Sequence, residues 1–458
     1  MRESVLGGAR VGYNSAVPTA AFTTLGCKVN QYETQRILES FEAAGFAVVP
    51  FETAADVYVI NSCSVTSIAE SKSRYTVRRA ARLNPAAKVV FTGCAAQMSI
   101  NKGDLIDGVD VLVDNPNKLQ ALDHLLRAFP EFAQTLIPSD QPGPRAPGRT
   151  RATLKIQDGC SVMCSYCSIP FTRPGLVSRP AEEVLAEARL MAASGYREII
   201  LTGVLIGAYG PDSGSGGPDF EELIELLQRE LSPFAPVRLR ISSIEMRQVT
   251  GRLIRMIQAG GPVPIVPHLH IPLQSGDSGV LRDMNRPYDQ LDYLNLCATL
   301  QREIPDISIT TDIMVGFPTE TAERFDSTRA VCEAVRFLKI HAFRFSPRFG
   351  TPADQWGDPV SVGEKQARSL ALNELSSRTG AEHLQRFVGR TMRVLVEGKK
   401  RKDGLMEGLT DNYLTVHFAG PESLRREFCW VRILDIQSEA AIGELATEEK
   451  AAQLSVRV

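Results

Sequence analysis

The 458-residue sequence has no long apolar run, no excess of charge and no internal repeat. No stretch approaches the ~18 uninterrupted apolar residues of a membrane span, and the N-terminal segment lacks the apolar core of a signal peptide. Lys and Arg number 51 against 53 Asp and Glu, so nucleic-acid binding would have to come from a local patch. We therefore expect a cytoplasmic protein of about three domains.

The nine cysteines, an odd number, argue against a disulfide framework, which a chain of this length does not need. In a reducing compartment, clustered cysteines indicate metal or redox chemistry instead. Six of the nine lie before residue 170 and form two sets of three. We expect the others to pack in the core: Cys297, Cys332 and Cys429.

Apolar patterning predicts an α/β protein with three domains and one linker. Residues 18–136 alternate strands and helices, which predicts a parallel-sheet, Rossmann-like domain with strands at 21–26, 56–62, 88–93 and 109–114. Residues 137–152 hold four prolines and predict the linker.

The two later sections differ in their pattern. Residues 153–388 predict a partial (βα)6 barrel, with strands at 153–157, 197–203, 237–243, 267–273, 307–316 and 339–346. Residues 389–458 carry short strands between Gly, Asp and Asn turns, which predicts a small antiparallel β-barrel.

The segment GCSVMCSYCSIP places Cys160, Cys164 and Cys167 at C-x3-C-x2-C spacing, directly after the first strand of the predicted barrel. Three thiolates from one loop can hold three irons of a cubane cluster and leave the fourth iron open. A structural zinc site usually has four ligands, and no fourth cysteine lies nearby. We interpret the loop as an iron–sulfur site, with zinc or incidental core packing as the alternatives.

Three further cysteines, Cys27, Cys63 and Cys94, each follow a predicted strand of the first domain. Because the carboxyl ends of parallel strands lie at one edge of a sheet, residues distant in sequence can converge there. A single cysteine at such a place would be read as a small buried hydrophobe. Three together predict a second metal cluster.

Weaker signals accompany these two. His268 and His270 alternate on one predicted strand, which suits either a metal pair or the polar lining of a barrel. A basic run lies in a predicted hairpin loop of the last domain and suits either single-stranded RNA or a solvated turn. This run consists of Lys399, Lys400, Arg401 and Lys402.

From about Ala21 onward the chain resembles the methylthiotransferase family of radical S-adenosylmethionine (SAM) enzymes. The matching segments are TLGCKVNQYETQ, INSCSVTSIAESKSR, FTGCAAQ, GCSVMCSYCSIP, LTGVLIGAYG, HLHIPLQSGD, TDIMVGFPTET, FRFSPRFGTPA and GLTDNYLTV. The resemblance implies a three-cysteine domain, a radical-SAM barrel and an RNA-binding TRAM domain. It also implies two [4Fe–4S] clusters, a radical-SAM cluster on Cys160, Cys164 and Cys167 and an auxiliary cluster on Cys27, Cys63 and Cys94.

The activity implied is tRNA modification, with SAM as cofactor and an electron donor such as a flavodoxin or ferredoxin. The motifs look like the branch that places a methylthio group on C2 of N6-threonylcarbamoyladenosine in the anticodon stem-loop. One SAM would methylate sulfur at the auxiliary cluster, and the radical from a second would activate C2. The alternatives are isopentenyl-adenosine, a ribosomal-protein aspartate, or a non-catalytic iron–sulfur sensor of RNA.

The resemblance also implies contacts at the barrel mouth. SAM would meet Tyr166, Gly203, Val204, Gln274, Ser275 and Asp312. The threonylcarbamoyl group carries a carboxylate, which a guanidinium can bind through two parallel hydrogen bonds. The arginines expected near that mouth are Arg173, Arg344 and Arg348.

Overall fold

The computed structural model describes residues 17–137, 149–210, 217–399 and 401–447. The chain forms two compact units, one of residues 1–64 and 68–143 and the other of residues 65–67 and 144–458. Most of the predicted linker, residues 138–148, lies outside the described residues. Among the described helices, none is long and apolar enough to cross a membrane.

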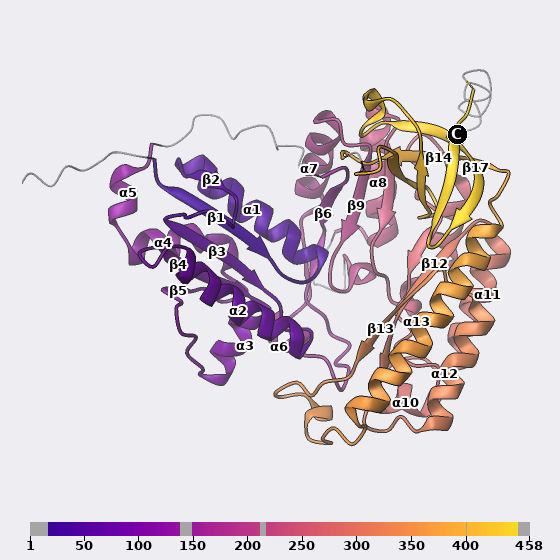
Figure 1. The fold of residues 1–458 in the computed structure, drawn as a ribbon, viewed down its shortest axis with the longest axis horizontal. Coiled ribbons are helices and arrows are strands. Elements are labelled where there is room, and N and C mark those ends of the chain that lie inside the picture. The colour runs from indigo at the N-terminus through magenta and orange to yellow at the C-terminus, as the bar shows by residue number, and fades with distance from the viewer. Residues whose placement is uncertain (1–16, 138–148, 211–216, 400, 448–458) are drawn as a thin grey trace, which may run out of the picture. The chain divides into compact units, whose positions relative to one another are not determined.

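The first unit is built on a parallel sheet with the strand order β2-β1-β3-β4-β5 (Figure 1). Three of the four predicted strands match closely; the fourth is the short β5, and β2 was not predicted. The strands are β1 (Thr19–Thr24), β2 (Ala47–Val49), β3 (Val57–Ser62), β4 (Lys88–Gly93) and β5 (Val111–Leu112). Every residue of the central β3 is buried, as expected of a strand covered on both faces.

Helices cover both faces of this sheet. One face packs against α1 and α4 through Ile37, Phe41 and Leu125, and the other packs against α2 and α3 through Val77 and Ala95. The helices are α1 (Lys28–Ala44), α2 (Ser67–Leu83), α3 (Cys94–Lys102), α4 (Ala121–Ala128) and α5 (Glu131–Thr135). The helices α1 and α3 begin directly after β1 and β4, so their first residues lie at the carboxyl edge of the sheet.

The second unit contains the predicted partial barrel. Its strands pair in parallel as β10-β9-β6 and β11-β12-β13, and isolated parallel bridges, Leu239–Ile265 and Ser243–His270, connect the two groups. All six predicted strands are present: β6 (Ala152–Lys155), β9 (Glu198–Thr202), β10 (Arg238–Ile241), β11 (His268–His270), β12 (Ser308–Val315) and β13 (Lys339–Arg344).

Helices surround the barrel and share one large core with its strands (Figure 1). They are α7 (Ala181–Ala193), α8 (Phe220–Leu231), α9 (Gly251–Ala259), α11 (Gln290–Glu303), α12 (Ala322–Val335) and α13 (Val362–Gln385). Shorter elements lie in the connections: β7 (Gln157–Asp158), α6 (Ile169–Thr172), β8 (Val177–Ser178) and α10 (Ser278–Asp283). The loop from β7 to α6 carries the C-x3-C-x2-C motif.

The C-terminal section is a closed barrel with the strand order β14-β15-β16-β18-β17. Its strands are β14 (Thr391–Val396), β15 (Met406–Thr410), β16 (Thr415–Phe418), β17 (Phe428–Gln437) and β18 (Ala440–Leu445). The last of these was not predicted. It lies between β16, to which it is parallel, and β17, to which it is antiparallel.

The β15–β16 turn packs against the amino ends of the larger barrel's strands. There Glu198 is completely buried between Arg238 and Arg240, with nitrogen–oxygen distances of 2.5 and 2.7 Å. Burial alone would raise the pKa of Glu198, but the two guanidinium groups hold it well below its usual value. Arg238 also pairs with Asp411, and Tyr413 stacks on His268 at 4.0 Å between ring centroids. The small barrel therefore lies at the end of these strands opposite to their carboxyl ends.

Candidate active site

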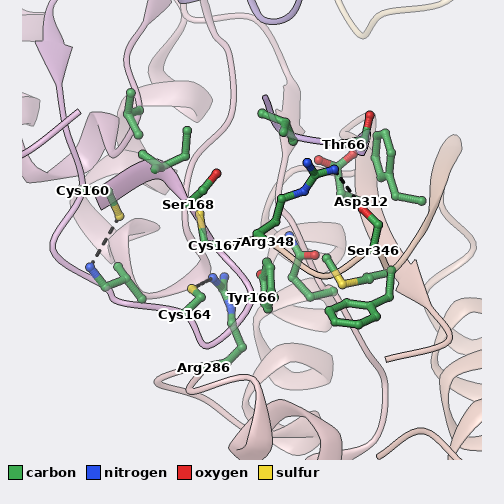
Figure 2. A pocket seen from close by; sticks show the side chains of 18 of the residues that line it. Thr66, Cys160, Cys164, Tyr166, Cys167, Ser168, Arg286, Asp312, Ser346 and Arg348 are labelled. Carbon is green, nitrogen blue, oxygen red and sulfur yellow. Dashed lines mark hydrogen bonds between the residues drawn. The ribbon is translucent and has the colours of Figure 1, made fainter. Parts of the chain in front are cut away.

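A cavity of about 260 Å³ lies at the carboxyl ends of the barrel strands. The cysteine loop forms one wall, and the ends of β12 and β13 form another (Figure 2). Catalytic groups of (βα) barrels gather at this end because loops from many strands meet there. Among the residues lining the cavity are Cys160, Cys164, Cys167, Tyr166, Val204, Glu245, Gln274, Arg286, Asp312, Met314, Phe343, Arg344, Ser346 and Arg348.

The cysteine loop is held by the segment that follows α10. Ser165 N donates to Met284 O at 3.0 Å, and Asn285 Nδ2 donates to Met163 O at 2.9 Å. Met163 has a φ of 52°, which turns the loop between its first two cysteines. These contacts fix a backbone in which all three thiols reach the cavity.

The chemistry of this donor set fits a metal cluster. Burial, together with the neighbouring cysteines, raises the pKa of Cys160 and raises that of Cys167 to about 12. Three neighbouring thiolates are unfavourable without a cation, whereas iron binds thiolates directly. The residues present therefore fit a cluster that Cys160, Cys164 and Cys167 would hold, with one iron left without a cysteine ligand.

Arg286 is one of the residues at this site that sequence reasoning missed. Its Nη1 donates to Cys164 Sγ at 3.2 Å (Figure 2). Its Nη2 pairs with Glu245. Nε donates to Tyr288 Oη at 3.1 Å, and only 8% of the residue is exposed. Nothing in the segment MNRPY marks this arginine as functional, because the fold alone brings it to the cysteine loop.

The residues expected to contact SAM are distributed unevenly. Tyr166, Val204, Gln274 and Asp312 line the cavity. The amide N–H of Val204 donates to Gln157 Oε1 at 3.0 Å, so this N–H already has a partner. Gly203 and Ser275 are not among the described residues that line the cavity. Gly203 packs closely against Gln157, since a Cβ on it would lie 3.0 Å from Gln157 O. Ser275 Oγ accepts a hydrogen bond from Asp277 N at 3.2 Å.

Of the three arginines expected to bind substrate, two line the cavity and one does not. Arg344 and Arg348 line the cavity, and Arg348 Nη2 donates to Ser346 Oγ at 2.9 Å. Arg173 lies outside the described lining; its buried guanidinium binds both oxygens of Asp158 at 2.7 and 2.8 Å. That ion pair anchors the segment after the cysteine loop. The guanidinium of Arg173, which was expected to contact a substrate, is therefore bound by Asp158 in this structure.

In the first unit, Cys27, Cys63 and Cys94 follow β1, β3 and β4, which are neighbours in the sheet. The loops that carry them are closely packed. Gly26 has a φ of +99°, and a Cβ there would lie 2.7 Å from Cys63 Sγ. The convergence expected from strand topology is therefore present at the first two of these loops.

A network of buried asparagines organises this edge. Asn30 Nδ2 donates to Leu25 O and Ser62 O at 2.8 and 2.9 Å, which joins the loops before Cys27 and Cys63. Asn115 Nδ2 lies 3.9 Å from Cys94 Sγ and provides a hydrogen-bond donor to that sulfur. Three soft sulfur donors with an amide beside one of them suit a second iron–sulfur cluster.

The weaker signals have mixed outcomes. His268 and His270 do share one face, since both lie within 3.1 Å of Thr310 Oγ1. The basic run lies between the two strands of a hairpin, β14 and β15. Arg401 pairs with Asp403 and Glu407, whereas Lys399 and Lys402 are exposed. Lys400 lies outside the described residues. The expectation of core packing for Cys297, Cys332 and Cys429 is confirmed, as all three are buried.

Comparison with known families defines the class. Residues 154–332 match the radical SAM superfamily, residues 385–446 match the TRAM domain, and residues 19–113 match the uncharacterised protein family UPF0004. The barrel with its cysteine loop is thus a radical-SAM domain, which carries an iron–sulfur cluster and uses SAM.

Comparison with curated proteins defines the family. The chain is 36% identical over 428 residues to a threonylcarbamoyladenosine tRNA methylthiotransferase, MtaB, of Bacillus subtilis, covering 91% of this chain and 94% of the relative. Identity to MtaB of Thermotoga maritima is 34%, with 93% and 96% covered. A tRNA-2-methylthio-N(6)-dimethylallyladenosine synthase of Geobacillus thermodenitrificans is 32% identical, with 93% and 83% covered. The chain belongs to the radical-SAM methylthiotransferase family and is of the MtaB type.

Among solved structures, the fold is similar to that of the radical SAM methyltransferase TsrM from Kitasatospora setae. The TM-score is 0.52 at 14% identity, with 74% of this chain and 77% of that chain covered. A likeness at this identity supports the fold assignment alone.

Proposed function

We propose that this protein transfers a methylthio group to C2 of N6-threonylcarbamoyladenosine in tRNA. The observation that carries the proposal is the extended similarity to MtaB proteins together with two complete cysteine triads in one chain. Replacing an unactivated aromatic C–H by S–CH3 is out of reach of ordinary acid–base catalysis. A site that combines SAM with an iron–sulfur cluster supplies a radical for this step.

In this proposal each triad has its own role. Cys160, Cys164 and Cys167 would hold the cluster that serves SAM cleavage, and Cys27, Cys63 and Cys94 would hold an auxiliary cluster that serves sulfur insertion. Tyr166, Gln274 and Asp312 line the space for SAM and the target nucleoside. A flavodoxin or ferredoxin supplies electrons.

Arg344 and Arg348 are proposed to bind the carboxylate of the threonylcarbamoyl group from their positions on the cavity wall. Apolar walls would suffice for an isopentenyl group. Arg173 is not assigned to the substrate in this proposal, because its Nη1 already donates to both carboxylate oxygens of Asp158.

The test is reconstitution of the purified protein with iron, sulfide, SAM and reductant. We expect 2-methylthio product on tRNA carrying threonylcarbamoyladenosine and little on isopentenylated tRNA, measured by mass spectrometry of digested nucleosides. Comparable turnover on both, or preference for the isopentenyl form, would contradict the substrate assignment. A protein that forms no 5′-deoxyadenosine under any condition would be a sensor instead of an enzyme.

The TRAM domain is proposed to bind tRNA through exposed basic residues, including Lys399 and Lys402. Truncation near Gly389 should weaken tRNA binding but leave slow SAM cleavage, because the cysteine loop lies at the other end of the barrel strands. Added salt should also weaken binding of the intact protein, since phosphate contacts release counterions. Unchanged tRNA affinity after truncation would move recognition to the barrel face.

A further inference from the structure

Helix α2 concentrates positive charge in a chain whose 51 Lys and Arg face 53 Asp and Glu. Its 17 residues, SIAESKSRYTVRRAARL, hold five Lys or Arg and a single acidic residue, Glu70. The helix α1, on the other face of the sheet, holds two Lys or Arg against three Glu (Figure 1). The positive charge of the first unit is therefore gathered on one helix.

Part of this charge lies on the face of α2 that is turned away from the sheet. The buried side of the helix, which includes Val77 and Ala80, packs on the sheet. Four residues at intervals of three or four positions share the opposite face and are exposed. This exposed stripe consists of Lys72, Tyr75, Arg78 and Arg82. It is about 15 Å long at 1.5 Å per residue, the length of several nucleotides.

The cations of the exposed stripe have no carboxylate partner within the part of the chain that the structure describes. The neighbouring Arg74 does have one, since its Nη2 lies 3.6 Å from Glu70 Oε1. Arg78 lies four positions from both Arg74 and Arg82, and like charges at that spacing destabilise a helix. Helix stability therefore does not explain these charges, and their gathering on one face indicates an external anion.

Tyr75 lies within the exposed stripe, and 54% of its surface is accessible. The guanidinium carbon of Arg82 lies 5.7 Å from the centre of its ring. An exposed aromatic ring among cations favours RNA, because an unpaired base can stack on the ring while phosphates meet the cations. A membrane surface would require a broad apolar face, and an acidic protein would require the charges alone.

The helix is also tied to one of the cysteines at the sheet edge. It begins at Ser67, four residues after Cys63. On its buried side, Ser73 Oγ accepts a hydrogen bond from Cys63 N at 3.3 Å. An RNA strand on the exposed stripe would therefore lie on the helix that supports the loop of Cys63.

We propose that the exposed stripe of α2 is a tRNA-binding surface, with its three cations on phosphates and Tyr75 stacked on an unpaired base. The inference rests on the proposed function in one respect, the identity of the RNA as tRNA. It gives the unit with the auxiliary cysteines an RNA contact of its own, in addition to that of the TRAM domain.

The test measures binding of a fluorescently labelled full-length tRNA transcript to the full chain over a range of salt concentrations. R78Q/R82Q should raise Kd on the order of tenfold at about 0.1 M salt and reduce the slope of log affinity against log salt by roughly 1.5, because two phosphate contacts are lost. Y75A should raise Kd by about five- to a hundredfold, the effect of one lost base stack, without changing that slope. Y75F keeps the ring and should bind as the unaltered protein does.

The matched control is R36Q/R127Q, which removes the same charge from α1 and α4 on the other face of the sheet. It should change neither the Kd nor the salt dependence. Iron content and Tm report whether each variant is folded. The Tm of R78Q/R82Q should not fall, because the substitutions remove like charges four positions apart.

The outcomes separate this inference from the proposed function. If R78Q/R82Q and Y75A bind tRNA no more weakly than the control pair, the stripe is an ordinary solvated face and the inference is overturned. Turnover that falls with a flavodoxin as reductant but not with dithionite, at unchanged tRNA affinity, would assign the stripe to an acidic protein and also overturn it. If tRNA binds through the stripe but no methylthio product forms, the inference stands and the proposed function fails.

Discussion

The two cysteine triads reach the same chemistry by different routes. Cys160, Cys164 and Cys167 share one loop, which the segment around Asn285 and Arg286 holds in place. Cys27, Cys63 and Cys94 are distant in sequence, and the order of β1, β3 and β4 brings their loops to one sheet edge. The first site depends on spacing along the chain, whereas the second depends on a correctly paired sheet. The two should therefore respond differently to mutation.

The largest expected effect comes from removing each triad in turn. C160A/C164A/C167A should abolish formation of 5′-deoxyadenosine, because the open iron that binds SAM is lost. C27A/C63A/C94A should leave SAM cleavage and abolish methylthio product. Each variant should retain about four irons, one cubane's worth. Measurement is by iron analysis and chromatography of both products; methylthio product at a normal rate from the second variant would refute the auxiliary assignment.

A smaller effect should show how far each of the two cysteine sites depends on the backbone conformation beside it. Gly93, directly before Cys94, has a φ of +93°, and a Cβ there would lie 2.4 Å from Asn61 Oδ1 and 2.5 Å from Ser62 O. G93A should destabilise the first unit by at least the ~1–3 kcal/mol of a strained backbone position and reduce iron at the auxiliary site. Thermal unfolding and iron content check this.

The counterpart in the barrel loop is Met163, which already has a positive φ of 52°. M163G should keep its iron and change stability little, because glycine adopts that conformation without strain. Equal iron loss in G93A and M163G would mean that the two sites do not differ in their dependence on backbone geometry.

The smallest effect concerns the donors beside the sulfurs. Arg286 donates to Cys164 Sγ at 3.2 Å with a full positive charge, whereas Asn115 is a neutral donor 3.9 Å from Cys94 Sγ. R286Q should make the reduction potential of the barrel cluster more negative, since the reduced cluster loses a stabilising cation. N115A should shift the auxiliary cluster in the same direction by about half as much, because charge-assisted hydrogen bonds are roughly twice as strong. Redox titration followed by electron paramagnetic resonance measures both, and equal shifts would contradict the charge argument.

Much of the fold follows from local patterns. The six barrel strands were predicted because apolar periodicity is strong in each. Among the strands that were missed are β2, of three residues at a sheet edge, and β18, whose place depends on pairing with β16 and β17. Short strands with little apolar alternation depend on their partners, so sequence periodicity is weak there.

The sequence by itself determined the family, the two sets of cysteines and their division between a loop and three strand ends. It did so because C-x3-C-x2-C is a local spacing and because strand ends in a parallel sheet share an edge. Only the tertiary structure decided which side chains surround these sites. Arg286 donates to Cys164, Arg173 pairs with Asp158, and His341 lies beside Asp312 on the neighbouring strand. Such pairings join residues far apart in the chain, and hydrogen-bond geometry between distant side chains exists only once the backbone has folded.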